Sequence, residues 1–129
     1  MNGRLLILAS AAALARGIQQ AGINVVDIGS VPTPLVYFAC HHLQTHSGVA
    51  VTGSHNPPDY NGLKMVLGGE TLSGEAIQAL RQRILDNRLT HGAGAYSKQD
   101  LTDAYLDRIV SDVKLARPMK IVVDCGNGI

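Results

Sequence analysis

The chain has 129 residues, of which 46% are hydrophobic and 16% charged, a balance that excludes an intrinsically disordered chain and predicts one globular domain. The formal net charge of +1 provides no electrostatic footprint for nucleic acid, so we expect no nucleic-acid partner. The two cysteines, Cys40 and Cys125, are far apart and neither belongs to a CxxC motif. We therefore expect neither a disulfide framework nor a zinc knuckle, and a reducing, cytoplasmic compartment is the natural one.

The first predicted element is a helix over residues 5–21. The segment is rich in alanine and contains no proline, and Gly22 follows it where a C-terminal cap belongs. An apolar run that follows an arginine, as this one follows Arg4, is also typical of a signal peptide, but no convincing cleavage site comes after it. The run is also much too short to span a bilayer. We expect a buried helix and no membrane association. The residues expected to share one helix face are Leu5, Leu8, Ala12, Ala15 and Gln19.

Strands and helices then alternate with short links, which is typical of a layered α/β domain. Thr33, Ser73 and Asp100 are good N-cap residues for three further helices. These helices are predicted over 35–44, from Ser73 to about Leu85, and from Asp100 to a segment that Pro118 closes. Strands are predicted over 23–28, 48–51, 63–67 and 120–124. The residues between 86 and 99 read as a loop because of Asn87, Gly92 and Gly94.

The stretch 48–66 reads as a strand, a polar loop and a returning strand. Residues 48–51 form a short apolar run with two valines, as a buried strand requires. The loop then offers the Ser54 hydroxyl and the His55 imidazole, and Asn61-Gly62 is a tight-turn signal before the second apolar run. We therefore expect a reactive hydroxyl just past a strand end, where open α/β sheets place their ligands.

This stretch resembles the active-site loop of the α-D-phosphohexomutases. That family carries a threonine-(glycine or alanine)-serine-histidine-asparagine-proline run after a buried strand, and residues 52–57 reproduce the run without a departure. The continuation over 58–64 is most similar to the phosphomannomutase/phosphoglucomutase branch. The resemblance implies an α/β fold in which helices flank a layered sheet, as in the first domain of a phosphohexomutase.

The resemblance also implies an activity, the interconversion of hexose 1-phosphate and hexose 6-phosphate of mannose or glucose through a hexose 1,6-bisphosphate. Ser54 would carry the phosphoryl group as a phosphoserine, whose charge backbone N–H groups near Gly53 and a cation can hold. His55 would help to position the phosphoryl group and the sugar. Asn56 would shape the loop and face the substrate. Lys64 would act in proton transfer or, equally well, stabilise the phosphoryl charge.

A magnesium ion is implied in the same way. The family places Mg²⁺ between the serine phosphate and three aspartates of an Asp-x-Asp-x-Asp loop in its second domain. No such run exists in this chain. Ser54, through its phosphate, is therefore the one metal ligand that we expect here, which agrees with the preference of Mg²⁺ for waters and few carboxylates.

Other chemistries have weaker support in the residues. The loop lacks a G-x-S-x-G elbow, and His55 is a poor base for the adjacent Ser54, so a serine hydrolase would need a distant partner such as His91. His42 and His46 have the spacing of two zinc ligands on a helix, but we expect the helix to end between them and interpret both as surface histidines. Taken alone, Gly53-Ser54 would be an ordinary turn.

The resemblance suggests where domains divide. Residues 121–128 are similar to the opening of the family's second domain, so we assign 1–117 to part of domain I and 118–129 to the start of domain II. The family's domain I begins with a segment of which only the tail resembles residues 2–4. We therefore expect a piece of the family protein, incomplete at its N-terminus and inactive alone, with poor stability because sheet-edge groups are unpaired. The alternatives are a phosphoglucosamine mutase or a non-catalytic fold fragment; the sequence does not indicate an oligomeric state.

Overall fold

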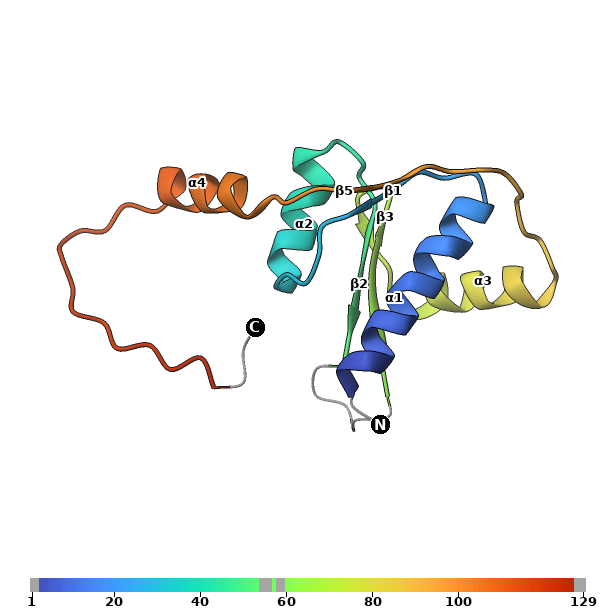
Figure 1. The fold of residues 1–129 in the computed structure, drawn as a ribbon, viewed down its shortest axis with the longest axis horizontal. Helices are drawn as coiled ribbons and strands as arrows, with labels where there is room; N and C mark the ends of the chain where they lie inside the picture. The colour runs from blue at the N-terminus through green and yellow to red at the C-terminus, as the bar shows by residue number, and fades with distance from the viewer. Residues whose placement is uncertain (1–2, 54–56, 58–59, 127–129) are drawn as a thin grey trace.

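The computed structural model describes residues 3–53, 57 and 60–126, and Figure 1 shows the path of the chain. The helices are α1 (Gly3–Gln20), α2 (Thr33–His42), α3 (Gly74–Leu85) and α4 (Thr102–Asp112). The strands are β1 (Val25–Asp27), β2 (Gly48–Thr52), β3 (Gly62–Leu67), β4 (Glu70–Thr71) and β5 (Tyr96–Lys98). The predicted α/β class is confirmed.

The described strands divide between two small sheets. β2, β3 and β4 form an antiparallel sheet in that order, and β1 pairs with β5 in parallel. α1 contacts β2 and β1, while α2 packs on the opposite face of β2, so helices flank the strands on both sides (Figure 1). The strand order leaves β1 and β2 each at the edge of a sheet, with a space between them.

Helix α1 ends where the sequence predicted, and Gly22 is the reason. The N–H of Gly22 donates to Gln19 and the N–H of Ile23 donates to Ile18, the two hydrogen bonds of a Schellman cap. This cap requires the left-handed backbone that Gly22 adopts at φ +87°.

The predicted face of α1 is right at Ala15 and Gln19, which are partly covered, and wrong at Leu8 and Ala12. Leu8 is 60% exposed and Ala12 is exposed, whereas Ile7, Ala11, Leu14 and Ile18 are partly covered. None of the described residues of α1 is fully buried, so the helix is also not the buried one that we expected. Alanine and leucine occur on all sides of this helix, so the spacing of apolar residues could not distinguish the face that meets the strands.

Strand β5 lies inside the segment that was predicted to be loop. It follows Gly92 and Gly94, whose N–H groups donate to Gln20 at 2.7 Å and to Gln19 at 2.8 Å. These two bonds satisfy carbonyl groups at the C-terminus of α1, which have no partner within the helix. The glycines that were interpreted as marking a loop therefore also mark a close approach of two backbones.

The largest cluster of buried side chains joins α2 to the start of α4. Leu35, Ala39 and Leu101 are buried there, and Tyr105 packs against them. The Asp100 carboxylate accepts the N–H of Thr102 at 2.8 Å, but Leu101 stands in the cap position of α4, so Asp100 lies one residue before the place that we predicted. Thr33 does not cap α2, because the helix begins at Thr33 itself and Pro32 stands in the cap position.

The C-terminal part of the chain differs from the prediction. Residues 113–126 contain neither helix nor strand, so the strand predicted over 120–124 is not formed. Figure 1 shows this segment, in orange to red, as a wide loop that starts on the side of α4 away from both sheets and then turns back. A strand is stabilised by pairing with a neighbour, and the described residues place none beside Val122, which is 92% exposed. Ile84 of α3 is likewise 65% exposed, so the amphipathic pattern of that helix faces water.

We predict that Gly94→Ala destabilises the fold. A Cβ on Gly94 would collide with the carbonyl oxygen of Ile23, and both are backbone atoms that cannot rotate away. The expected loss is about 1–3 kcal/mol in the free energy of unfolding, measured by urea denaturation. Gly17→Ala is the matched control, because a Cβ there meets nothing within 4 Å and alanine favours the helix by about 1 kcal/mol. Equal midpoints for the two variants would contradict the close approach.

Candidate functional site

The candidate site is built on the antiparallel pair β2 and β3. Their register pairs Gly48 with Val66 and ends at the pair Thr52 and Gly62. The chain between these ends, residues 53–61, therefore leaves and re-enters the sheet at one point. The two predicted strands are confirmed, while most of the loop between them lies outside the described residues. Gly62 is the first residue of β3 and pairs with Thr52, so Asn61-Gly62 is not the tight turn that we expected. The N–H of Tyr60 donates to the carbonyl of Pro57 at 2.9 Å.

Three of the four predicted site residues, Ser54, His55 and Asn56, lie outside the described residues. The structure does fix the end of the strand that precedes them, because β2 ends at Thr52, two positions before Ser54.

Lys64 is the predicted site residue that the structure describes. It lies on β3 opposite Ala50 and is exposed. Directly opposed residues of antiparallel strands share a face, and the face alternates along each strand. Lys64 is therefore on the same face as Thr52, about 7 Å back from the loop at the usual rise of a strand. This position lies close to the loop without contributing to the core.

The face that carries Lys64 is the one against α2. A Cβ on Gly48 would approach the Cys40 Sγ to 2.6 Å and Val36 to 3.3 Å, so glycine is needed where α2 crosses the strand. Its partner Val66 is buried on the same face. The α2 end of this face is thus tightly packed, while the loop end carries the exposed Lys64.

The base of the loop contacts helix α1. The Asn61 Nδ2 donates to the Ser10 Oγ at 3.3 Å. A Cβ built on Gly53 would meet the Ile7 Cδ1 at 3.4 Å and the Asn61 Oδ1 at 3.6 Å. Sequence reasoning missed Asn61 and Ser10 as residues of the site, because Asn61-Gly62 matched a turn signal and Ser10 was one polar residue in an apolar helix.

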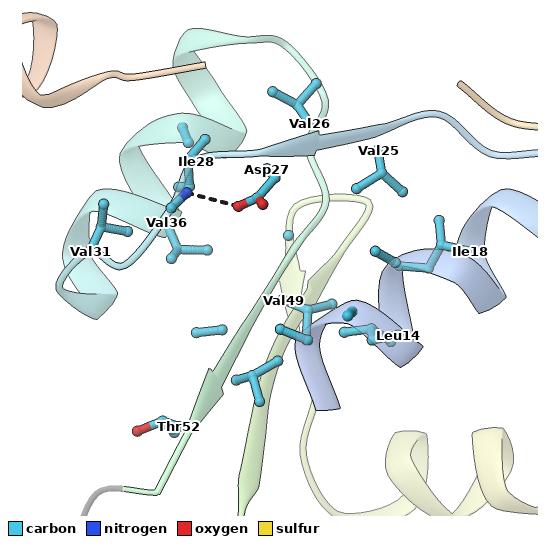
Figure 2. Close-up of a pocket in the computed structure, with 18 of the residues that line it drawn as sticks. Leu14, Ile18, Val25, Val26, Asp27, Ile28, Val31, Val36, Val49 and Thr52 are labelled. Carbon is cyan, nitrogen blue, oxygen red and sulfur yellow. Dashed lines mark hydrogen bonds between the residues drawn. The ribbon is translucent and has the colours of Figure 1, made fainter. Parts of the chain in front are cut away.

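A cavity of about 1490 Å³ opens between β1 and β2. Figure 2 shows Leu14 of α1, Val25 of β1, Val36 of α2 and Val49 of β2 around it. This volume exceeds the roughly 300–1,000 Å³ of ordinary small-molecule pockets, and the helix and strand faces that line it are those that normally form a core. We interpret it as a gap in the core, with the base of the loop at one end through Thr52, rather than as a preformed sugar pocket.

The exposed area of the chain agrees with this interpretation. The solvent-accessible area is 10119 Å². A compact monomer of 13.6 kDa is expected to expose about 6,600 Å². The chain therefore leaves much more surface in water than a closed domain of its mass.

Asp27 is the carboxylate that lies at the rim of this cavity. The hydroxyl of Tyr96 donates to it across the β1–β5 pair, and the N–H of Gly29 donates to it at 2.8 Å (Figure 2 shows the Asp27 side). The Tyr96 hydrogen bond, followed by that of Gly29, lowers the pKa of Asp27, and the same bond raises the pKa of Tyr96. Both partners are used in joining two strands, so we assign them a structural role.

The histidines outside the loop have no common site. α2 ends at His42, so His46 is not on the same helix face. The His42 ring stacks on Phe38 with 5.0 Å between centroids. Across the described ranges, no three His, Cys, Asp or Glu residues come together as a metal site would require. Nor does this part of the chain include a helix long and apolar enough to cross a membrane.

Comparison with known proteins identifies the family. Residues 3–91 match the family model described as phosphoglucomutase/phosphomannomutase, alpha/beta/alpha domain I. The chain therefore belongs to the phosphoglucomutase/phosphomannomutase family, and the resemblance seen at residues 52–64 extends over most of the sequence.

Individual relatives support this assignment. The chain is 52% identical over 116 residues to a phosphomannomutase/phosphoglucomutase of Pseudomonas aeruginosa, covering 90% of this chain and 25% of that protein. It is 48% identical over 116 residues to a phosphoglucomutase of Neisseria gonorrhoeae, covering 88% and 25%. A crystal structure of a phosphoglucomutase/phosphomannomutase family protein from Burkholderia thailandensis superposes with a TM-score of 0.81 at 49% identity, covering 92% of this chain and 28% of that one. The chain thus spans about a quarter of the length of these relatives.

We predict that the 129-residue chain binds a hydrophobic dye such as ANS and unfolds with low cooperativity, because the cavity exposes apolar side chains. Val49→Ser should lower the dye fluorescence, since Val49 lines the cavity. Val122→Ser is the control, because Val122 is 92% exposed and is not among the cavity residues. A sharp, high-temperature melt of the monomer without dye binding would contradict the open core.

Proposed function

We propose that the full-length protein containing this chain is a phosphohexomutase, which interconverts the 1-phosphate and 6-phosphate of mannose or glucose through a phosphoserine at Ser54. The phosphoryl group passes from the Ser54 oxygen to the free hydroxyl of the sugar phosphate, whose proton leaves to a base. The resulting hexose 1,6-bisphosphate turns over in the site and returns its other phosphoryl group to the serine. The relatives named as phosphomannomutase or phosphoglucomutase support this substrate class.

The observation that carries the proposal is the β2–β3 register. A loop whose two ends meet at the Thr52–Gly62 pair presents its residues from a rigid base, and the family's serine run begins at that pair. Phosphoryl transfer depends mainly on positioning and on stabilisation of charge. Ser54 follows the end of β2 by two residues, and this short link to a paired strand supports the positioning that phosphoryl transfer needs.

The other predicted residues have supporting roles in this proposal. His55 positions the phosphoryl group and the sugar, and Asn56 shapes the loop beside the substrate. Lys64 supports the charge of the phosphoryl group from the neighbouring strand, since it is exposed and lies on the same face as Thr52. An ammonium group near a phosphate dianion stabilises the charge that develops during transfer.

Magnesium belongs to the proposal only through Ser54. The described residues supply no cluster of carboxylates that would fit Mg²⁺, so the phosphate on Ser54 would be one ligand and other parts of the full-length protein would supply the rest. The cation would neutralise phosphate charge when bound.

We also propose that residues 1–117 belong to domain I and that 118–129 begin domain II. The family model for domain I matches within the first range. The exposed apolar residues Ile121, Val122 and Val123 would gain a packing partner in a second domain. In the 129-residue chain alone we expect no mutase turnover. A phosphoglucosamine mutase is the alternative within the family.

We predict that Ser54→Ala abolishes both mutase turnover and phosphoryl uptake of the full-length protein. Intact-mass spectrometry after incubation with a hexose 1,6-bisphosphate should show one added phosphoryl group on the wild type and none on the variant. Ser73→Ala is the matched control, because Ser73 is an exposed serine at the start of α3 whose side chain makes no cap hydrogen bond. Phosphoryl uptake by the Ser54→Ala protein would refute the proposed carrier.

We predict that Lys64→Met lowers kcat of the full-length protein by about 10²–10³, the usual effect of removing one group that stabilises transition-state charge. Lys64→Arg should retain part of the activity, because it keeps the charge but changes its geometry. Lys114→Met serves as control, since Lys114 is exposed and lies beyond α4. An unchanged kcat in Lys64→Met would show that Lys64 is an ordinary surface residue of β3.

A further inference from the structure

The two ends of the loop 53–61 meet at one spot on helix α1. Ile7 and Ser10 are three residues apart and therefore lie on the same side of that helix. Gly53, at the first end, lies beneath Ile7, and Asn61, at the second end, donates to Ser10. We call these four residues, Ile7, Ser10, Gly53 and Asn61, the loop-base clamp.

The loop-base clamp holds the two chain segments next to each other just beyond the last residue pair of the β2–β3 ladder. The last ladder pair is Thr52 and Gly62. Beyond it, two hydrogen bonds among the described residues restrain the loop, that of Tyr60 to Pro57 and that of Asn61 to Ser10. The first joins two residues of the loop to each other. The second ties the loop to a different element.

The Asn61 side chain lies between helix α1 and the other end of the loop. Its Nδ2 donates to Ser10, while its Oδ1 lies 3.6 Å from the position that a Cβ of Gly53 would occupy. Gly53 is the residue directly before Ser54. A change in the Asn61 side chain therefore alters the surroundings of the backbone that leads into Ser54.

We propose that Asn61 is a positioning residue for phosphoryl transfer at Ser54, acting through its hydrogen bond to Ser10 and its place beside Gly53. The proposal rests on the proposed function of Ser54 as the phosphoryl carrier. In-line transfer requires the attacking oxygen, the phosphorus and the leaving oxygen to align, and a displacement of about 1 Å can cost on the order of 10² in rate. A clamp at the loop base sets this alignment.

The test measures the rate at which Ser54 in the full-length protein takes a phosphoryl group from a hexose 1,6-bisphosphate, together with steady-state kcat and KM. Asn61→Ala should slow the transfer about ten- to hundredfold, with KM changed much less. Ser10→Ala should give a smaller loss, and Ser10→Thr, which keeps the hydroxyl, should recover most of it. Ser111→Ala is the control, because Ser111 is an exposed serine whose side chain bonds only within its own helix α4.

The coupling between the two residues separates positioning from general weakening of the fold. The double variant should be no slower than Asn61→Ala alone, because one interaction is removed in both. Urea midpoints of all variants give the structural reference, and Asn61→Leu, which keeps the size but can neither donate nor accept a hydrogen bond, serves if Asn61→Ala does not fold. A wild-type protein that takes up no phosphoryl group would refute the function of Ser54. Uptake by the wild type at a rate that Asn61→Ala or Asn61→Leu leaves unchanged, or fully additive losses in the double variant, would instead overturn the role of Asn61.

Discussion

The pairing of β2 with β3 is the constraint on which the rest of this structure depends. Five consecutive residue pairs, from Gly48–Val66 to Thr52–Gly62, fix the two strands in one register. A slip by one residue would exchange the two faces, moving Val66 away from α2 and Lys64 away from the face of Thr52. The register therefore decides at the same time which side chains enter the core, where the loop 53–61 emerges and on which side of it a charged group lies.

The two helices that flank this pair have different functions. α2 packs so closely that Gly48 is required at the crossing, which holds the far end of the hairpin. α1 contacts the near end, where Ile7 and Ser10 meet the loop base. The hairpin is thus supported at both ends, while β2 borders the cavity between β1 and β2 along its whole length. Stability and site geometry come from different contacts, so a chain with an open core can still hold the two ends of the loop, Gly53 and Asn61, at α1.

The sequence predicted the parts of the fold that short-range rules determine. The β2–loop–β3 unit and the cap at Gly22 follow from valine content, polarity and glycine chemistry within a few residues. The covered face of α1 was not predictable, because apolar residues occur on all sides of the helix. β5 was missed because Gly92 and Gly94 serve a contact with the end of α1, some seventy residues earlier in the chain. The strand predicted over 120–124 is absent for a related reason: its β-branched residues favour a strand, but a strand also needs a neighbouring strand to pair with. The position of Lys64 on the returning strand was predictable, but the Asn61–Ser10 contact depends on tertiary structure.

The central claim is that Ser54 carries a phosphoryl group that it exchanges with a sugar phosphate. Phosphorus-31 NMR of the full-length protein tests this most directly. The account predicts a phosphomonoester signal bound to the protein, which shifts to the position of an oxygen-18 phosphate when excess hexose monophosphate with an oxygen-18-labelled phosphate is added, because each turnover returns the sugar's own phosphoryl group to Ser54. A protein that shows no bound phosphorus signal after exposure to the bisphosphate, or one whose signal keeps its unlabelled position in the presence of the labelled monophosphate, would contradict it.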